Sequence, residues 1–208
     1  MNDPRTRTVG RGYDEIADRF AAWKDQIAGD PRDDWTAELT ALLSEGARVV
    51  DLGCGAGLPS TKLLADAGYE VTGVDISAEQ LQRARKNVPS GHFVHADIAE
   101  LELEPASVDA VTAYYSLNHF PRDILGPLLA RISGWLTPDG LLLAAFGAHD
   151  TPDWKGEWLG TTMFFSSWDP ETNRRLIRAA GLETIRDEVV TLNEPEGDAL
   201  FHWLLARR

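Results

Sequence analysis

The sequence predicts an α/β fold with a doubly wound, mostly parallel sheet. From residue 47 onward, strongly apolar strand patterns alternate with helix patterns, which is the order expected for parallel strands connected by helices. The first strand pattern ends in an acid followed by three alternating glycines, from Asp51 to Gly57. Such a turn lets the main chain approach a ligand without a Cβ in the way, so the sequence also predicts a cofactor site.

The N-terminal segment, residues 1–46, is expected to hold two helices. In the first, apolar side chains recur at spacings of three and four and form one stripe. This stripe consists of Tyr13, Ile16, Ala17, Phe20 and Trp23. The second helix is expected from residue 33 or 34 to 44, with Gly46 as its stop. Its inward side chains are expected to be Trp35, Leu39, Leu42 and Leu43.

Strands and helices then follow in turn. Strands are expected near residues 47–52, 70–75, 92–96, 108–115 and 140–146. The helix after the first of these opens with Pro59, which suits a first helical turn. Ser77 and Gln80 have the spacing of a capping box, and Asp169 and Gly181 open and close another helix. Two last strands are expected at 183–193 and 199–206, around a turn rich in Pro, Gly and acids.

A long insertion, Gly147 to Trp168, lies between a strand and a helix. We expect it to be a loop, and loops of this length in compact domains are usually lids or binding loops. Its aromatic and thioether side chains are Trp154, Trp158, Met163, Phe164, Phe165 and Trp168. They are expected to form one wall of an apolar acceptor pocket, closed by Tyr13, Phe20 and Trp23; the alternative is a plain cover over the sheet. His149, Asp150 and Glu157 could bind polar groups of the acceptor.

The spacing of two acids narrows the class of cofactor. Asp75 ends the second strand 24 residues after Asp51, where a carboxylate can accept hydrogen bonds from ribose hydroxyls. A dinucleotide fingerprint requires a third glycine where this chain has Leu58. Asp51, placed at the mouth of the turn, would repel phosphates but tolerate a cationic amino acid and sulfonium. The turn therefore favours a sulfonium cofactor over a dinucleotide.

Residues Asp51 to Gly57 resemble motif I of the class I S-adenosylmethionine-dependent methyltransferases, D/E-x-G-x-G-x-G, at every position. Residues 71–77, 92–98, 108–120 and 135–146 resemble, in order, the later motifs and the turn and strand that follow them. Asp139 is a mild departure, because the common form of that turn is Pro-Gly-Gly. Within the class, the chain is most similar to the methyltransferase type 11 set, which includes ubiquinone and menaquinone methyltransferases.

The resemblance implies an architecture for the chain. One domain, 1–208, would consist of a helical lid at 1–46 and a Rossmann-like core at 47–208, with the insertion on the substrate side. The core would hold a seven-stranded, mostly parallel sheet with an antiparallel last strand. The cofactor would be S-adenosylmethionine.

The resemblance also implies the cofactor contacts. The expected binding residues are Tyr13, Asp51, Gly53, Gly55, Gly57, Asp75, Ile76, Asp97, Ile98 and Ser116. In the family, the acid at Asp97 accepts a hydrogen bond from the adenine amino group, and its neighbour, here Ile98, donates a backbone N–H. Two alternatives stay open: Asp97 could cap a helix or turn, and Ile76 could pack in the core rather than on the adenine.

His119 and Tyr115 are the candidate catalytic residues. The segment 114–119 leaves the carboxyl end of the fourth strand, where ligands of open α/β sheets bind. His119 is the best candidate general base, since an ordinary histidine pKa of about 6.5 suits proton abstraction. The alternative is that His119 caps the next helix or contacts the cofactor. Methyl transfer mainly requires an aligned acceptor and exclusion of water, so a base is needed only for a protonated acceptor.

The composition narrows the classes of binding partner and the cellular compartment that we expect for the chain. A formal net charge of −13 disfavours nucleic acid and anionic membrane surfaces, and no run approaches the roughly 20 apolar residues of a membrane span. The start, Met1 to Arg5, has no apolar signal-peptide region, so a cytoplasmic location is expected. The single cysteine, Cys54, is expected to be a small buried filler, and no metal-ligand spacing is present. The chain is expected to be a monomer or a homodimer.

These observations predict a methyltransferase that acts on an oxygen or nitrogen atom of a small, partly apolar molecule. A first alternative is a nicotinamide-dependent oxidoreductase, which the missing third glycine and the lack of a Tyr-x-x-x-Lys pair disfavour. A second is a cofactor-binding protein of the same fold without methyl transfer, such as a pericyclase-like or regulatory member. The sequence offers little against this second alternative, because transfer by proximity needs no obligatory catalytic residue.

Overall fold

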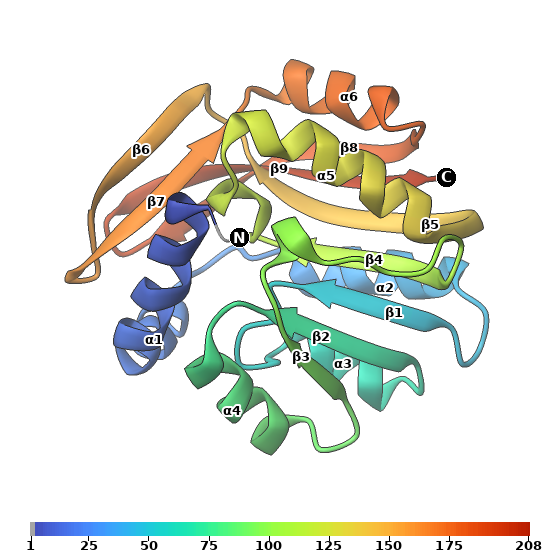
Figure 1. Cartoon of the computed structure of the whole chain (residues 1–208), viewed down its shortest axis with the longest axis horizontal. Helices are drawn as coiled ribbons and strands as arrows, with labels where there is room; N and C mark the ends of the chain where they lie inside the picture. The colour runs from blue at the N-terminus through green and yellow to red at the C-terminus, as the bar shows by residue number, and fades with distance from the viewer. Residues whose placement is uncertain (1–2) are drawn as a thin grey trace.

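A seven-stranded sheet forms the centre of the molecule in the computed structural model, which describes residues 3–208 (Figure 1). Residues 1 and 2 belong both to the expected lid segment and to the start that was searched for a signal peptide, and they lie outside the described residues. The strands are β1 (Arg48–Leu52), β2 (Glu70–Asp75), β3 (His92–His95), β4 (Val108–Tyr114), β5 (Leu136–Gly147), β8 (Glu183–Glu194) and β9 (Gly197–Arg207). Their order across the sheet is β3-β2-β1-β4-β5-β9-β8.

The strand directions confirm the predicted Rossmann-like sheet. Strands β1 to β5 pair in parallel, and the last strand, β9, runs antiparallel between β5 and β8. The order reverses between β1 and β4, so the carboxyl ends of these strands flank a crevice, which is where open α/β sheets bind ligands. Strand β5 begins at Leu136, earlier than expected, because the turn at Asp139 (φ +66°) forms an irregularity within the strand rather than preceding it.

Helices cover both faces of the sheet. They are α2 (Arg32–Leu42), α3 (Ser60–Asp66), α4 (Ala78–Asn87), α5 (Arg122–Trp135) and α6 (Pro170–Ala179), with the short helices η1 (Ile98–Glu100) and η2 (Leu117–His119). One core cluster joins α5 and α6 to the sheet, and a second joins α2 and α3 to the opposite face. Ser77 and Asp169 cap α4 and α6 as the sequence predicts, since each side chain accepts a backbone N–H of the first turn.

Helix α2 departs in one respect from its predicted stripe. Trp35 and Leu39 are buried as expected, but Leu42 is 47% exposed, so its inward assignment is wrong. The helix ends at Leu42, and Leu43 takes an extended conformation instead of continuing the helical period. The side chain of Leu43 then packs against the core in place of Leu42.

The insertion is a β-hairpin rather than the expected loop. Strands β6 (Thr151–Trp158) and β7 (Thr161–Ser167) pair antiparallel through a two-residue turn. Both turn residues, Leu159 and Gly160, have positive φ (49° and 76°), as the right-handed twist of a tight hairpin requires. Leu at the first of these positions gave no hairpin signal in the sequence, which explains the wrong expectation.

Helix α1 (Pro4–Lys24) lies across the carboxyl ends of the strands and against β7 (Figure 1). The approach to the hairpin is close, because a Cβ at Gly12 would stand 2.8 Å from the Cε of Met163. On its other side α1 meets α4, where Asp14 accepts hydrogen bonds from the Ser77 hydroxyl and the Glu79 amide. None of the helices in residues 3–208 is long and apolar enough to cross a membrane.

Candidate active site

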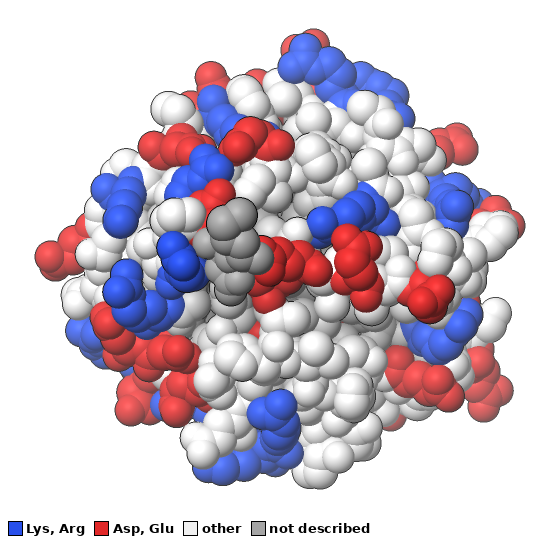
Figure 2. Space-filling view, in the orientation of Figure 1, with Lys and Arg blue, Asp and Glu red and all other residues white. Residues whose placement is uncertain are grey.

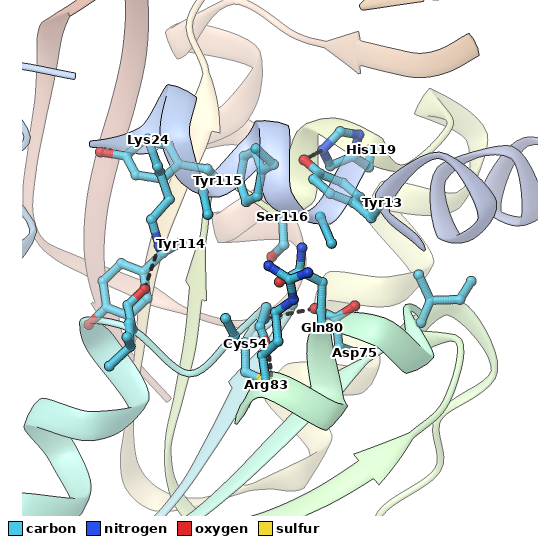
Figure 3. A pocket seen from close by; sticks show the side chains of 18 of the residues that line it. Tyr13, Lys24, Cys54, Asp75, Gln80, Arg83, Tyr114, Tyr115, Ser116 and His119 are labelled. Carbon is cyan, nitrogen blue, oxygen red and sulfur yellow. Dashed lines mark hydrogen bonds between the residues drawn. The ribbon is translucent and has the colours of Figure 1, made fainter. Parts of the chain in front are cut away.

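A cavity of about 1130 Å³ lies at the carboxyl ends of the strands, beneath α1 (Figure 3). Its walls come from the segments after four strands and from the inner face of the helix. The segments at these strand ends are residues 53–56 at the end of β1, 75–76 at the end of β2, 97–98 after β3, and 114–116 with 118–120 at the end of β4. The cavity therefore occupies the crevice that the strand order predicts.

The three glycines after β1 do different things. Gly55 lines the cavity with φ +54°, and a Cβ there would approach only the Gln80 Oε1, at 3.9 Å. Gly53 also lines the cavity, but here the absence of a Cβ makes room for Ser116. A Cβ added at Gly53 would lie 2.4 Å from the Cβ of Ser116. Gly57 packs on α4 and lies outside the lining, so the structure does not place it at the cavity. Only at Gly55 would a side chain project into open cavity space.

Asp75 lines the cavity and is held by two backbone amides. Its Oδ1 accepts a hydrogen bond from the Ser77 amide and its Oδ2 one from the Gly55 amide, both at 2.8 Å. Burial raises the pKa of this carboxyl to about 6, although the backbone amides favour the charged form. Since a carboxylate oxygen can accept two hydrogen bonds, both oxygens keep capacity for hydroxyls in the cavity.

The predicted adenine end contains Asp97 and two isoleucines. Asp97 caps η1 by accepting the Ala99 amide at 2.9 Å, which was the alternative assignment, but it also lines the cavity. Its other oxygen accepts the hydroxyl of Thr6, at 2.7 Å, so α1 is tied to this end of the site. Ile76 and Ile98 both line the cavity, so the predicted adenine contacts of these two residues stay predictions.

Asp51 is not at the mouth of the turn, so the expected position of its carboxylate is wrong. The side chain is 2% exposed, lies outside the cavity lining, and accepts hydrogen bonds from Thr61 and Thr112 at 2.6 and 2.9 Å. Burial raises the pKa of this carboxyl, and the two hydroxyls oppose that rise. Asp51 lies within β1, opposite Thr112 of β4, and its enclosed side chain ties α3 to β4.

We therefore expect Asp51→Ala to reduce stability. The variant leaves two buried threonine hydroxyls without an acceptor, and the free energy of unfolding should fall by about 2–4 kcal/mol. Urea denaturation followed by circular dichroism measures this loss. Asp66→Ala, at a 60% exposed side chain that pairs with Lys62 on α3, is the matched control and should change stability by less than about 1 kcal/mol. Equal losses in the two variants would contradict the anchoring role of Asp51.

Cationic groups, which the sequence did not predict, line the end of the cavity near Leu58. The Lys24 ammonium donates a hydrogen bond to the Leu58 carbonyl at 2.6 Å, and burial, followed by the nearby Arg32, lowers its pKa to about 8. The Arg32 guanidinium lies over the rings of Tyr114 and Tyr115 and pairs with Asp30, while its Nε is buried without a partner. Charged residues on α1 and α2 resemble an ordinary solvated face in sequence, so no signal identified them.

Tyr115, a candidate catalytic residue, lines the cavity in an unusual backbone conformation. Its φ is +58°, and its hydroxyl donates a hydrogen bond to Asp30 at 2.8 Å. Burial and the charge of Asp30 raise the pKa of the phenol, so it stays protonated at neutral pH. The hydroxyl is thereby committed to Asp30 and gives no geometric support to a role as a base.

His119 and Tyr13 form a hydrogen-bonded pair in the cavity wall (Figure 3). The Nδ1 of His119 lies 2.9 Å from the Phe164 carbonyl oxygen, which can only accept, so Nδ1 donates its proton there. In the neutral ring Nε2 then has a free lone pair, and it accepts the Tyr13 hydroxyl at 2.9 Å. Burial without a carboxylate partner lowers the histidine pKa to about 4, well below the expected 6.5. The ring is therefore neutral at physiological pH.

Five aromatic rings in mutual contact, including the ring of Tyr13 itself, line this end of the cavity. They are Tyr13, Phe20, Trp23, Trp158 and Phe165.

Several residues of the insertion that were expected in the pocket wall lie elsewhere. Met163 and Phe164 are buried in the contact of β7 with α1, Trp154 is 41% exposed, and Trp168 packs under Arg122. His149, Asp150 and Glu157 lie outside the lining, so the structure does not place them at the cavity. Among residues 3–208, no group of three metal-ligating side chains could hold a metal ion.

Comparisons with known proteins agree with the resemblance that the motifs predict. Residues 49–140 match the family model described as "Methyltransferase domain". The 27-O-demethylrifamycin SV methyltransferase of Amycolatopsis mediterranei is 32% identical over 141 residues, which cover 58% of this chain and 52% of the relative. The chain spans about half the length of the curated relatives it matches, with 52% and 55% of two of them covered.

Solved structures share the fold at low sequence identity. The 1,6-didemethyltoxoflavin-N1-methyltransferase of Burkholderia thailandensis, solved with 1,6-didemethyltoxoflavin and S-adenosylhomocysteine, superposes with a TM-score of 0.69 at 23% identity. That alignment covers 100% of this chain and 91% of the other. The [4+2]-cyclase SpnF superposes with a TM-score of 0.71 at 19% identity, covering 96% and 95% of the two chains.

Proposed function

We propose that this chain, which belongs to the class I S-adenosylmethionine-dependent methyltransferases, transfers a methyl group to an oxygen or nitrogen atom of a small, partly apolar molecule. One observation carries the proposal. A single cavity joins the glycine turn and Asp75 at one end to a cluster of aromatic rings at the other. Such continuity allows a cofactor and an acceptor to lie against each other while water is excluded.

The residues of the first end fit S-adenosylmethionine. Gly55 leaves a space that a Cβ would fill, and Asp75 offers carboxylate oxygens suited to ribose hydroxyls. Ile76 and Ile98 would flank the adenine beside Asp97. The Nε2 of Gln80, buried without a partner in the lining, remains as a free donor.

Arg32 and Lys24 would neutralise the cofactor's amino-acid carboxylate. Both line the cavity, and the unpartnered Nε of Arg32 is a buried donor that an anionic oxygen would satisfy. Tyr13 and Ser116, also in the lining, would complete the contacts. The expected contacts of Asp51 and Gly57 are not part of this proposal, because neither residue lines the cavity.

The bound cofactor supplies a methyl group on a sulfonium, and the chain's own residues do the rest. Helix α1 and the aromatic side chains close the cavity over the acceptor and exclude water. The Tyr13 hydroxyl would face the acceptor, and the neutral His119 Nε2 behind it would draw a proton through that hydroxyl. The Phe164 carbonyl fixes the imidazole tautomer that makes Nε2 the acceptor.

The class of acceptor is proposed from charge and cavity character. Blue and red side chains are interspersed on the face in Figure 2, and the net charge is −13, so the surface does not favour nucleic acid. A small-molecule acceptor, a cytoplasmic location and a monomeric or homodimeric state complete the proposal. The family assignment disfavours the nicotinamide-dependent alternative. The likeness to a cyclase concerns the fold, and a protein without methyl transfer remains the alternative to test.

Release of S-adenosylhomocysteine during a screen of small aromatic alcohols, phenols and amines tests the proposal. We expect turnover with at least one member of the screen, and loss of turnover in Gly55→Val. Calorimetric binding of S-adenosylhomocysteine without turnover of any acceptor would favour the non-transferring alternative. No binding at all would overturn the proposed cofactor site.

Cofactor affinity should depend on pH through Asp75. Its pKa is raised to about 6, and ribose hydroxyls donate better to the charged carboxylate, so affinity should rise as pH increases through 6. The rise should end near pH 7, because Lys24, with a pKa of about 8, begins to lose its charge above that pH. Below pH 6 the dissociation constant should increase by up to about tenfold per pH unit. Asp75→Asn should bind about 10- to 100-fold more weakly at pH 8 and lose this dependence. Calorimetry with S-adenosylhomocysteine from pH 5 to 8 measures both effects, and an unchanged profile in the variant would rule out Asp75 as its source.

A further inference from the structure

Glu194 is an unpaired carboxylate in the wall of the aromatic end of the cavity. It is half-buried, lines the cavity, and has no hydrogen-bond or ion-pair partner within residues 3–208. Most other acids of the lining are engaged: Asp75 by backbone amides, Asp97 by Thr6 and Ala99, Glu79 by Arg83, and Asp66 by Lys62. Asp25 also lines the cavity without a side-chain partner among the described residues, but it is exposed to solvent. Glu194 is therefore the half-buried acid of the lining that remains available to a ligand.

The fold fixes Glu194 in this position. It ends β8, and its neighbour Asn193 exchanges two backbone hydrogen bonds with Ala28, at 3.0 and 3.2 Å, just beyond α1. The next acid, Glu196, accepts the indole N–H of Trp23 at 2.7 Å. The tip of the β8–β9 hairpin is thus held against α1, and Glu194, next to these contacts, lines the cavity.

The electrostatics around Glu194 favour a cation. Burial, followed by the charge of Glu196, raises the pKa of the Glu194 carboxyl to about 7, because no positive group compensates it. After burial and Asp75, the charge of Glu194 also contributes to the raised pKa of Tyr13, so the carboxylate lies within electrostatic reach of the Tyr13–His119 pair. A ligand cation would relieve both effects.

We propose that the acceptor carries a basic nitrogen, which Glu194 binds as an ammonium beside the aromatic rings of the cavity. This inference rests on the proposed function and names the acceptor class. A carboxylate supplies the charge-assisted hydrogen bond, and the rings of Phe20, Trp23 and Trp158, which line the same cavity, are suitable partners for cation–π attraction. The bound nitrogen then orients the rest of the acceptor toward Tyr13 and His119.

Three probes with one ring and different charges test the inference by calorimetry. They are 2-phenylethylamine, 2-phenylethanol and 3-phenylpropionate, titrated at pH 8 with and without saturating S-adenosylhomocysteine. We expect the amine to bind at least about tenfold more tightly than the alcohol, and the anion to bind most weakly. In Glu194→Gln the amine should lose this advantage while the alcohol is unaffected. Glu183→Gln, which removes the same charge at the exposed far end of β8, should behave as wild type.

The outcomes separate this inference from the proposed function. If S-adenosylhomocysteine binds but amine and alcohol bind equally, or if the preference survives in Glu194→Gln, the role of Glu194 is overturned and the methyltransferase proposal stands. If S-adenosylhomocysteine does not bind, the proposed function fails, and the probe titrations without it still decide about Glu194. If Glu183→Gln also loses the preference for the amine over the alcohol, that preference comes from the protein's net charge, and the inference is overturned.

Discussion

Gly55→Val is expected to abolish cofactor binding while the fold stays intact. The backbone at this position has φ +54°, where a β-branched residue is strained by about 1–3 kcal/mol. Its side chain would project into cavity space beside Asp75, where we propose that the main chain contacts the cofactor. Together these effects should raise the dissociation constant for S-adenosylhomocysteine by more than about 10³-fold, which corresponds to about 4 kcal/mol.

Gly46→Val provides the matched control for backbone strain. Gly46 has φ +69°, lies between α2 and β1, and a Cβ there would meet nothing within 4 Å. Its variant should lose similar stability in urea denaturation and bind S-adenosylhomocysteine as wild type does. If both variants lose binding equally, the loss at Gly55 comes from destabilisation rather than from a blocked site. If Gly55→Val folds and binds normally, the cofactor does not contact this turn.

The sheet could be predicted because its signals are local. Each parallel strand is a short apolar run ending in an acid or a turn, and β2 was predicted with its observed bounds, Glu70–Asp75. The hairpin β6–β7 was missed because a Leu-Gly turn lacks the usual asparagine or aspartate signal. Helices and strands were therefore predictable where the hydrophobic periodicity and the turn residues agree. They were not predictable where the turn uses an uncommon residue.

Side-chain direction at the site was less predictable than the backbone. Asp51 and Asp75 both follow apolar runs in sequence, yet Asp75 faces the cavity and Asp51 is enclosed by Thr61 and Thr112. Strand β1 continues to Leu52, so Asp51 lies inside the strand, opposite Gly73 and Thr112, whereas Asp75 is the last residue of β2. Glu194 falls in the expected turn after residue 193, which resembles any acidic loop in sequence, but in the structure it ends β8, and the contact between Asn193 and Ala28 holds this strand end against the segment after α1.

The pKa of His119 was also not predictable from the sequence. An ordinary pKa near 6.5 was expected for His119, and burial lowers it to about 4. A lowered pKa means that the imidazole is neutral and competent to accept a proton throughout the physiological range, although it is a weaker base. The pH dependence of the reaction therefore becomes the most informative measurement on this residue.

His119→Ala is expected to lower kcat by roughly 10²- to 10⁴-fold for an acceptor that must lose a proton, with cofactor affinity nearly unchanged. The reason is the loss of the Nε2 lone pair behind the Tyr13 hydroxyl. Because the pKa of His119 is about 4, wild-type kcat should be flat from pH 6 to 9 and should decline only as the pH falls toward 4. Steady-state kinetics over this range, with a calorimetric titration of S-adenosylhomocysteine beside it, measures both quantities.

Tyr13→Phe decides whether His119 acts through the tyrosine or directly. The variant keeps the ring that packs against Phe20 and Trp158 but removes the hydroxyl that occupies Nε2. If the proton passes through that hydroxyl, Tyr13→Phe should lower kcat about as much as His119→Ala, and the double variant should be no slower than either single variant. If Tyr13→Phe instead keeps or raises kcat, Nε2 contacts the acceptor itself. If both variants keep full kcat, no general base is needed, and catalysis consists of aligning the acceptor and excluding water. This result is expected for an acceptor nitrogen that is already neutral in the cavity.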